Sequence, residues 1–155
     1  MKLTILAVGK ARKTVEAELW ADWLKRCPFP TNLQEFESRI PAGPARTKDE
    51  SEKLLSYISQ CSASSKRLIS LDPNGINVSS EELADMIGHW RAEGISQCFF
   101  AIGGADGHHP DFLKKADKKI AFGRTTWPHM LCRAMLAEQL YRAEMILAHH
   151  PYHRG

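Results

Sequence analysis

The feature of this sequence that most constrains its fold is a regular alternation of short apolar segments with longer segments of helical periodicity. The strand-like segments are 3–8, 33–39, 67–71, 97–102 and 119–122. The helix-like segments are 14–26, 47–59, 79–93, 111–116 and 130–148. Strands that alternate with helices form a mostly parallel sheet covered on both faces. We therefore expect an α/β fold of this kind, with all 155 residues in one domain.

Two residue pairs predict where helices begin. Thr47 and Glu50 have the spacing of a capping box, in which a hydroxyl and a carboxylate bond reciprocally to free backbone N–H groups. Ser79 and Glu82 have the same spacing. Gly94 predicts the end of the helix that Ser79 begins, because glycine readily takes the left-handed conformation found there.

Composition and cysteine spacing exclude several classes of protein. The four cysteines include no CxxC pair, so a disulfide framework or a thiolate zinc site is not expected. No apolar run approaches the ~18 residues that span a bilayer, and the first ten residues are too short for a signal peptide. A reducing, cytoplasmic compartment is the default expectation. The formal net charge of +3 permits an RNA partner but does not require one.

The ends of the predicted strands are where a ligand is expected. In open parallel sheets, ligands bind beyond the carboxyl ends of the strands. Leu71-Asp72 and Ile102-Gly103-Gly104 lie at two such ends. Three glycines within 103–107 let a backbone approach a ligand closely, although a simple tight turn explains the same pattern. Neither a dinucleotide-binding GxGxxG nor a phosphate-binding GK[ST] is present.

Polar groups also gather on the last predicted helix and after it. Residues 149–155 contain three histidines, a tyrosine and an arginine. Pro151 makes a continuing helix improbable, so helical metal-ligand spacing of these histidines has little support. On the helix itself, three charged residues fall away from the apolar stripe, and they form either a solvated face or a phosphate-facing one: Arg133, Glu138 and Arg142. His108 and His109 are expected to be an exposed loop pair.

Several of these segments together resemble the SPOUT methyltransferases. Within them, the resemblance is to the small family that methylates N3 of a pseudouridine in large-subunit ribosomal RNA. It covers the whole chain, from the Met1-Lys2-Leu3 start to the tail. The segments that carry it are Ile102-Gly103-Gly104, Pro128-His129-x-Leu131-x-Arg133, Glu138-x-Leu140-Tyr141-Arg142-Ala143 and His150-Pro151-Tyr152-His153-Arg154.

The resemblance implies a C-terminal trefoil knot, which pattern alone does not predict, since threaded chains are rare. It also implies S-adenosylmethionine as methyl donor, bound by the knot loops. By position, the contacts fall at Leu71, Gly103, Phe122, Gly123, Arg124, Thr125, Thr126 and Trp127. The chain departs from the family at Ala105-Asp106, where Pro-Glu is common, and at Phe122-Gly123, where Leu-Ser is common. Backbone contacts tolerate such changes, whereas side-chain contacts at these positions do not carry over.

For catalysis, the resemblance implies that no metal is needed, because the sulfonium already makes the methyl group a good electrophile. The expected catalytic residues are Tyr152, His153, Arg154, His129 and Arg142. The arginines would stabilise charge on the target base, and the other three would stack on it or accept its proton. The proton acceptor stays open among them and water.

The resemblance also implies partners. We expect a homodimer that acts on ribosomal RNA within the assembled ribosome, and we expect no membrane or DNA partner. The long apolar stripe of the last predicted helix leads us to expect an interface that includes part of that helix and the N-terminal helix near Trp20 and Trp23. Two alternatives remain open at this point. One is a noncatalytic RNA- or ribosome-binding protein, and the other is a metal-dependent hydrolase built on the histidine cluster.

Overall fold

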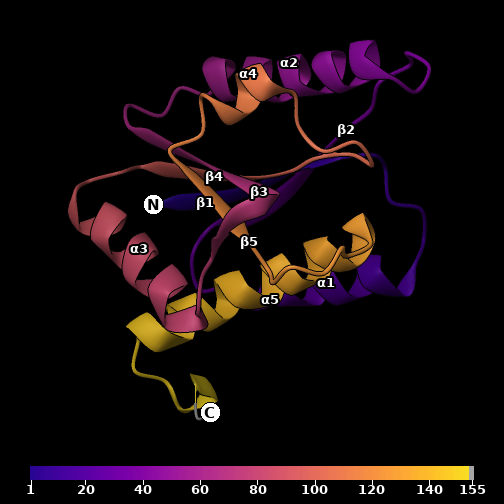
Figure 1. Cartoon of the computed structure of the whole chain (residues 1–155). Coiled ribbons are helices and arrows are strands. Elements are labelled where there is room, and N and C mark those ends of the chain that lie inside the picture. Colours follow the sequence, from indigo (N-terminus) through magenta and orange to yellow (C-terminus); the bar gives the residue numbers. More distant parts are fainter. Residues whose placement is uncertain (154–155) are drawn as a thin grey trace.

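A computed structural model describes residues 1–153 of the chain (Figure 1). These residues form five strands, five α-helices and a short 3-10 turn. In chain order the elements are β1 (Lys2–Val8), α1 (Val15–Arg26), β2 (Thr31–Phe36), α2 (Pro44–Gln60), β3 (Lys66–Asn77), α3 (Ser80–Ala92), β4 (Gln97–Ile102), α4 (Pro110–Leu113), β5 (Lys118–Ala121), α5 (His129–Leu147) and η1 (Pro151–His153).

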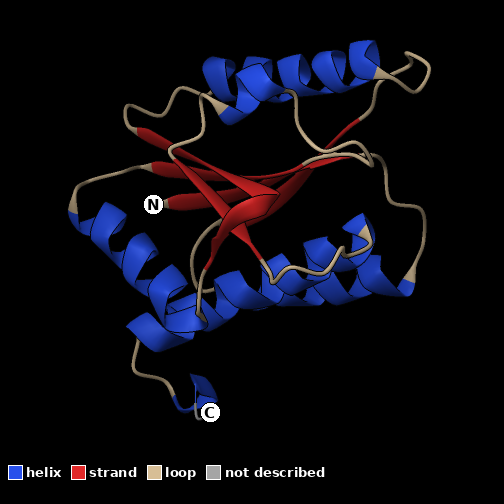
Figure 2. Ribbon diagram, in the orientation of Figure 1, coloured by secondary structure: helices blue, strands red, loops and turns tan. Residues whose placement is uncertain are grey.

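The strands form one sheet in the order β2-β1-β4-β3-β5, and every pairing between them is parallel. Helices α2 and α4 cover one face of the sheet, and α1, α3 and α5 cover the other (Figure 2). The predicted parallel α/β architecture is therefore confirmed. The trefoil knot stays a prediction. No helix within residues 1–153 combines the length and the apolar character needed to cross a membrane.

The two central strands explain why the apolar runs of the sequence are continuous. Every residue of β4 is buried, as is all of β1 after Lys2, because both faces of the sheet are covered. On one face, Trp20, Leu136 and Phe100 of β4 belong to one buried cluster. On the other face, Leu54 and Phe112 belong to a second buried cluster. The sheet is thus held from both sides, which fixes the carboxyl ends of its strands relative to one another.

The predicted helix starts have different outcomes. The Ser79–Glu82 capping box is present, with both reciprocal hydrogen bonds. The prediction that Thr47 and Glu50 form a capping box is wrong, because α2 begins three residues before Thr47, at Pro44. Proline suits the first helical position, since the N–H that it lacks has no helical partner there. Glu50 instead lies inside the helix, buried, and pairs with Arg46.

The strand predicted to end at Leu71 continues to Asn77, with a shift of register between Leu71 and Ile76. The irregular segment contains a local side-chain turn, in which the Asn74 backbone N–H donates to the Asp72 carboxylate over 2.7 Å. A Cβ on Gly75 would lie 2.7 Å from the backbone of Ile120. Glycine at this position therefore lets β5 pass directly against the irregular segment of β3.

Candidate active site

A cavity of about 360 Å³ lies at the edge of the sheet where β4 and β5 end and where β3 becomes irregular after Leu71. Its walls are this irregular segment of β3, the glycine loop (residues 103–107) and the 122–128 loop that leads into α5. This is the edge at which parallel sheets bind ligands, and the volume falls in the range of small-molecule sites. Seven of the eight residues expected to contact the cofactor line this one cavity: Leu71, Gly103, Phe122, Gly123, Thr125, Thr126 and Trp127. Arg124 is exposed and does not line it.

The shape of the glycine loop depends on its glycines. A Cβ on Gly103 would lie 2.7 Å from the backbone carbon of Gly107, which real contacts do not allow. Gly107 has a φ of +73° and donates its N–H to the Gly104 carbonyl over 3.0 Å. The loop is therefore a tight turn that also lines the cavity, so the two explanations of the glycine pattern hold together.

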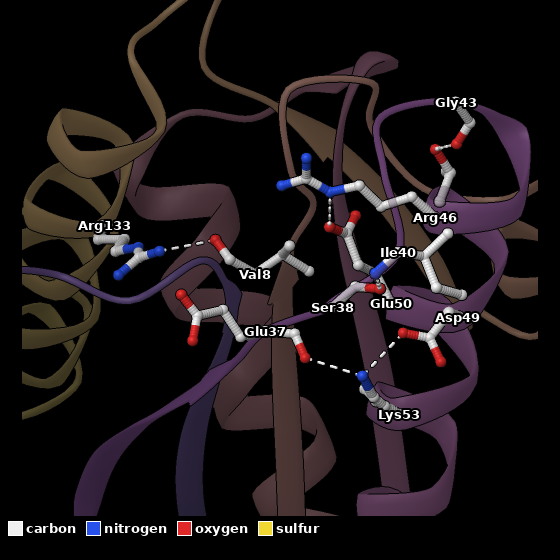
Figure 3. A network of polar contacts seen from close by, with 11 residues as sticks. Val8, Glu37, Ser38, Ile40, Gly43, Arg46, Asp49, Glu50, Lys53 and Arg133 are labelled. Atoms are coloured by element: carbon white, nitrogen blue, oxygen red, sulfur yellow. Dashed lines mark hydrogen bonds and ion pairs between the residues drawn. The ribbon is translucent and has the colours of Figure 1, made fainter.

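Helix α2 supports the glycine loop and the residues that follow it. Figure 3 shows the pair of α2 residues involved, Arg46 and Glu50. The buried Glu50 carboxylate accepts a hydrogen bond from Arg46 Nε over 2.9 Å. Its other oxygen would lie 3.0 Å from a Cβ on Gly104, so the carboxylate fills the space beside this glycine. Ser51 Oγ accepts the backbone N–H of His109 over 3.0 Å. These contacts fix the loop through a helix that sequence analysis did not connect with the site.

The expectation that His108 is exposed is wrong. Its ring stacks on Phe112, with 4.4 Å between centroids, and Nε2 lies 3.3 Å from the Ala101 carbonyl oxygen. Burial lowers the pKa of His108.

Two hydrogen bonds hold the 122–128 loop, which forms one wall of the cavity, in place. Trp127 Nε1 donates to the Phe122 carbonyl over 2.7 Å, which closes the loop on itself. Gly123, with a φ of +86°, donates its N–H to Asn77 Oδ1 over 3.1 Å. The loop is thereby tied to the end of β3. Pro128 then caps α5, as its position before the helix predicts.

The expectation that Arg133 faces solvent or phosphate is wrong. Its side chain is fully buried, and it donates to Glu35 over 2.7 Å (Figure 3 shows the contact with Val8). It also donates to the carbonyls of Val8 and Gly9 over 2.7 and 2.8 Å. A buried cation is tolerated when it is paired and hydrogen-bonded in this way. Arg133 therefore joins α5 to the ends of β1 and β2.

His129 lies one helical turn before Arg133 and lines the cavity. Burial lowers the pKa of His129, and the neighbouring Arg133 charge lowers it further. Its Nδ1 atom is buried and has no hydrogen-bond partner among the described residues. An unpaired buried nitrogen is unfavourable unless a ligand or water satisfies it. The cavity therefore combines apolar walls, loop backbone groups and one imidazole nitrogen, which fits a small, partly polar ligand such as S-adenosylmethionine.

The tail folds back onto the C-terminal half of α5. The Tyr152 hydroxyl donates to Glu138 Oε1 over 3.0 Å, and the Arg142 Nε donates to the same oxygen over 2.9 Å. The Tyr152 ring packs against Tyr141 and Trp23, with centroids 5.0 and 6.0 Å apart. Two expected catalytic residues, Arg142 and Tyr152, thus lie together.

The remaining expected catalytic residues are placed differently. His129 lies at the opposite end of α5 from the tail (Figure 1). Arg154 and the side chain of His153 lie outside the described residues. Sequence reasoning treated Glu138 only as a charged residue of a helix face, although its four-residue spacing from Arg142 predicts an ion pair. Among residues 1–153, no three His, Cys, Asp or Glu side chains gather as a metal site does.

An apolar groove lies beside the tail, on the outer face of α1, α3 and α5. It has a volume of about 480 Å³, and its lining includes Leu19, Trp23 and Met135. Val15 and Leu19 of α1 are 79% and 43% exposed, which is high for aliphatic side chains. Trp20, by contrast, is 7% exposed and belongs to the core. Trp23 borders the groove. An interface near these two residues stays a prediction.

Known proteins resemble this chain over its whole length. Residues 1–153 match the family described as "Predicted SPOUT methyltransferase". Relatives named ribosomal RNA large subunit methyltransferase H, from Paramagnetospirillum magneticum and Rhodospirillum centenum, are 43% and 41% identical, and the alignments cover at least 99% of both chains. A solved structure of a probable methylase family protein from Haemophilus influenzae has a TM-score of 0.55 at 9% identity, over 95% of this chain and 66% of that one, and it supports the fold alone. The chain belongs to the SPOUT methyltransferase family.

Proposed function

We propose that this methyltransferase binds S-adenosylmethionine in the cavity and methylates N3 of a pseudouridine in large-subunit (23S) ribosomal RNA. The observation that carries the proposal is that seven of the eight expected cofactor residues line one cavity. The names of the relatives support ribosomal RNA as the substrate. Residues 1–153 fold around a single five-stranded sheet, and we expect the assembled ribosome, rather than free RNA, to be the substrate.

The methyl donor supplies an activated methyl group, so the protein's task is to bind, orient and exclude water. Backbone groups of the glycine loop and of the 122–128 loop hold the donor, which explains how the chain tolerates Ala105-Asp106 and Phe122-Gly123. The exposed Arg124 contacts the donor through its backbone or not at all. No metal is required for this chemistry.

On the target base, N3 must lose its proton, and the resulting charge spreads onto the two flanking carbonyl oxygens. Arg142 and Arg154 stabilise this charge, since a cation aimed at a developing anion lowers the barrier. Tyr152 and His153 stack on the base or transfer its proton. Because its pKa is lowered, His129 is uncharged near neutral pH and can accept a hydrogen bond at the cavity.

The protein acts as a homodimer in this proposal. The tail of one chain lies at the far end of α5 from that chain's own His129 (Figure 1). A second copy seated on the groove beside α1 and α5 would bring its tail over the first copy's cofactor loops. The exposed Val15 and Leu19 support this contact, because an apolar surface of this kind favours association. A cytoplasmic location follows from the ribosomal substrate.

Mass spectrometry of ribosomal RNA from cells that lack this protein tests the proposal directly. We expect one methyl group to be missing from a large-subunit pseudouridine and to return when the purified protein and S-adenosylmethionine are added to those ribosomes. Calorimetry should show binding of S-adenosylmethionine to the isolated protein. Unchanged RNA in the deletion strain, or no detectable cofactor binding, would contradict the proposal.

A further inference from the structure

The carboxylate of Glu138 connects two of the proposed catalytic side chains. Its Oε1 atom accepts hydrogen bonds from Arg142 Nε and from the Tyr152 hydroxyl, and Arg142 Nη2 lies 2.6 Å from the same atom. Its Oε2 atom accepts from Gln139 Nε2 over 2.8 Å. The Glu138 side chain is only 18% exposed. The carboxylate is therefore held in place by neighbours on both oxygens, with one of them directed at the tail.

The state of Tyr152 limits what its phenol can do. Burial raises the pKa of Tyr152, and the hydrogen bond to Glu138 raises it further. The phenol is therefore protonated near neutral pH, with its O–H directed at a carboxylate. A protonated phenol accepts a further proton only while it passes its own proton on. The group that its hydroxyl contacts, and that can receive this proton, is Glu138.

We infer that Glu138 is the terminal acceptor of the N3 proton, which reaches it through the hydroxyl of Tyr152. The inference rests on the proposed function, because it assumes that Tyr152 contacts the target base. In this step the N3–H bond breaks, its proton moves to the Tyr152 oxygen, and the phenolic proton moves to Glu138 Oε1. The electron pair left on N3 forms the new N–C bond, while the pair of the broken S–C bond stays on sulfur.

Charge is balanced throughout this step. The negative carboxylate becomes neutral as the positive sulfonium becomes a neutral thioether, so no net charge accumulates. The Arg142 guanidinium, whose charge Glu138 balances at first, then loses its counter-ion. Its positive charge becomes available at the moment when charge develops on the carbonyl oxygens of the base, which is when stabilisation is most effective.

The other ionisable groups around the Glu138–Tyr152 pair leave this assignment intact. They include Tyr141 and Arg142 of α5, Arg26 of α1, which stacks on Trp23, and Glu81 of α3, which acts on Arg142 through its charge. The Nδ1 atom of His150 accepts the backbone N–H of Tyr152 over 3.2 Å and does not contact the phenol oxygen in this bond. The carboxylate of α3 offers a matched control, because replacing Glu81 removes a negative charge near Arg142 while the Tyr152–Glu138 hydrogen bond stays in place.

The pH profile of a single turnover tests the inference, with ribosomes and S-adenosylmethionine both saturating. Glu138→Gln keeps an oxygen that accepts from Tyr152 but cannot take up a proton. We expect its rate at pH 7 to fall by ~10²–10³, within the range for loss of a general base. We expect its rate to rise about tenfold per pH unit, because N3 must now ionise to solvent first. Tyr152→Phe should show the same slope, whereas the wild-type protein and Glu81→Gln should be nearly independent of pH between about 6 and 8.

A second measurement needs neither cofactor nor RNA. The ionisation of the phenols is followed by ultraviolet absorbance in the free protein, and the Tyr152 signal is the difference from Tyr152→Phe. We expect Glu138→Gln to lower the pKa of Tyr152 toward the ordinary value of 10.0, because the hydrogen bond to a negative carboxylate is lost. Glu81→Gln should shift it far less. Circular dichroism confirms that each variant is folded.

The outcomes separate the inference from the proposed function. If wild-type protein methylates the ribosome but Glu138→Gln keeps a rate within about threefold, which is under 1 kcal/mol, the inference is overturned. A slow Glu138→Gln variant with a flat pH profile also overturns it, since Glu138 then only positions Arg142 and Tyr152. If wild-type protein does not methylate the ribosome at all, the proposed function fails, and with it the premise of the relay. An unchanged Tyr152 pKa in Glu138→Gln contradicts the coupling of the pair independently of activity.

Discussion

Two arginines nine positions apart on α5 show how differently the two halves of this helix are used. Arg133 is fully buried and binds backbone carbonyls at the end of β1 together with Glu35 of β2. Arg142 is partly exposed and binds Glu138 on its own helix, with its guanidinium 4.9 Å from the Tyr152 ring. The first arginine holds secondary-structure elements together, and the second holds side chains that we assign to catalysis.

The two regions also differ in what builds them. The cavity at the N-terminal end of α5 is formed largely by loop backbone, braced from behind by buried polar groups such as Glu50 and Arg133. The tail region at the other end consists of side chains in contact, with Glu138 at its centre. Substitutions should therefore affect the cavity through folding and cofactor affinity, and should affect the tail through the rate of methyl transfer.

The largest effect on stability is expected for Arg133→Met. The change leaves Glu35 without its cation and the carbonyls of Val8 and Gly9 without their donor. We expect the free energy of unfolding to fall by about 3–5 kcal/mol, as for other broken buried ion pairs. Arg142→Met should lower it by less than ~1 kcal/mol, since that pair is partly exposed. Urea denaturation of both variants measures the difference. Equal losses in the free energy of unfolding would show that the two arginines contribute equally to stability, contrary to this prediction.

Removal of residues 152–155 should act almost entirely on the rate. Tyr152 packs on the surface of α1 and α5, so its loss leaves the core intact. We expect methyl transfer to ribosomes to fall by at least ~10²–10³, the range for losing one charge-stabilising contact. Affinity for S-adenosylmethionine, measured by calorimetry, should stay within about twofold, or ~0.4 kcal/mol. His149→Ala, next to the deleted segment, serves as the control, and full activity of the shortened protein would remove the tail from the site.

Gly103→Val should act on the cofactor. The added Cβ would meet the backbone of Gly107 at 2.7 Å, so the glycine loop itself must change shape. We expect affinity for S-adenosylmethionine to fall by about 100-fold, since displacements of ~1 Å have effects of that size. Asp106→Asn, at an exposed position of the same loop that does not line the cavity, should bind normally. Unchanged affinity in Gly103→Val would show that this loop does not bind the cofactor.

A mixture of these two defective proteins sharpens the comparison further. If the tail of one chain serves the cavity of its partner, a heterodimer of Gly103→Val with the shortened chain contains one intact site. Equal mixing makes half of the dimers heterodimers, so about a quarter of wild-type activity should return. Light scattering should first show that each variant is dimeric at micromolar concentration. No recovery from dimeric variants would place the tail and the cavity of each site in the same chain.

Physical reasoning on the sequence predicts the fold class and the edge of the sheet where the cavity lies, whereas the individual cofactor residues are implied by the resemblance to the SPOUT family. Alternating strands and helices imply a parallel sheet, parallel strands bring their carboxyl ends to one edge, and glycines mark the loops there. The burial of Arg133 could not be predicted in this way, because its partners Val8 and Glu35 lie 125 and 98 residues away along the chain. The contact between Tyr152 and Glu138 depends on the turn at His149, whose φ of +53° sends the chain back toward α5.

The smallest expected effect concerns His129 and the pH dependence of stability. Burial and the charge of Arg133 lower its pKa below the ordinary value of 6.5, so the folded protein holds the imidazole neutral where the unfolded chain protonates it. The unfolded state then binds more protons, and stability falls as the pH drops below about 6.5. We expect His129→Gln to reduce this loss between about pH 7 and 5, as measured by urea denaturation at each pH. The slope should decrease without vanishing, because burial lowers the pKa of His108 as well and its contribution remains. Identical slopes in the two proteins would show that His129 is as accessible in the folded protein as in the unfolded chain, and that Arg133 leaves its protonation unchanged.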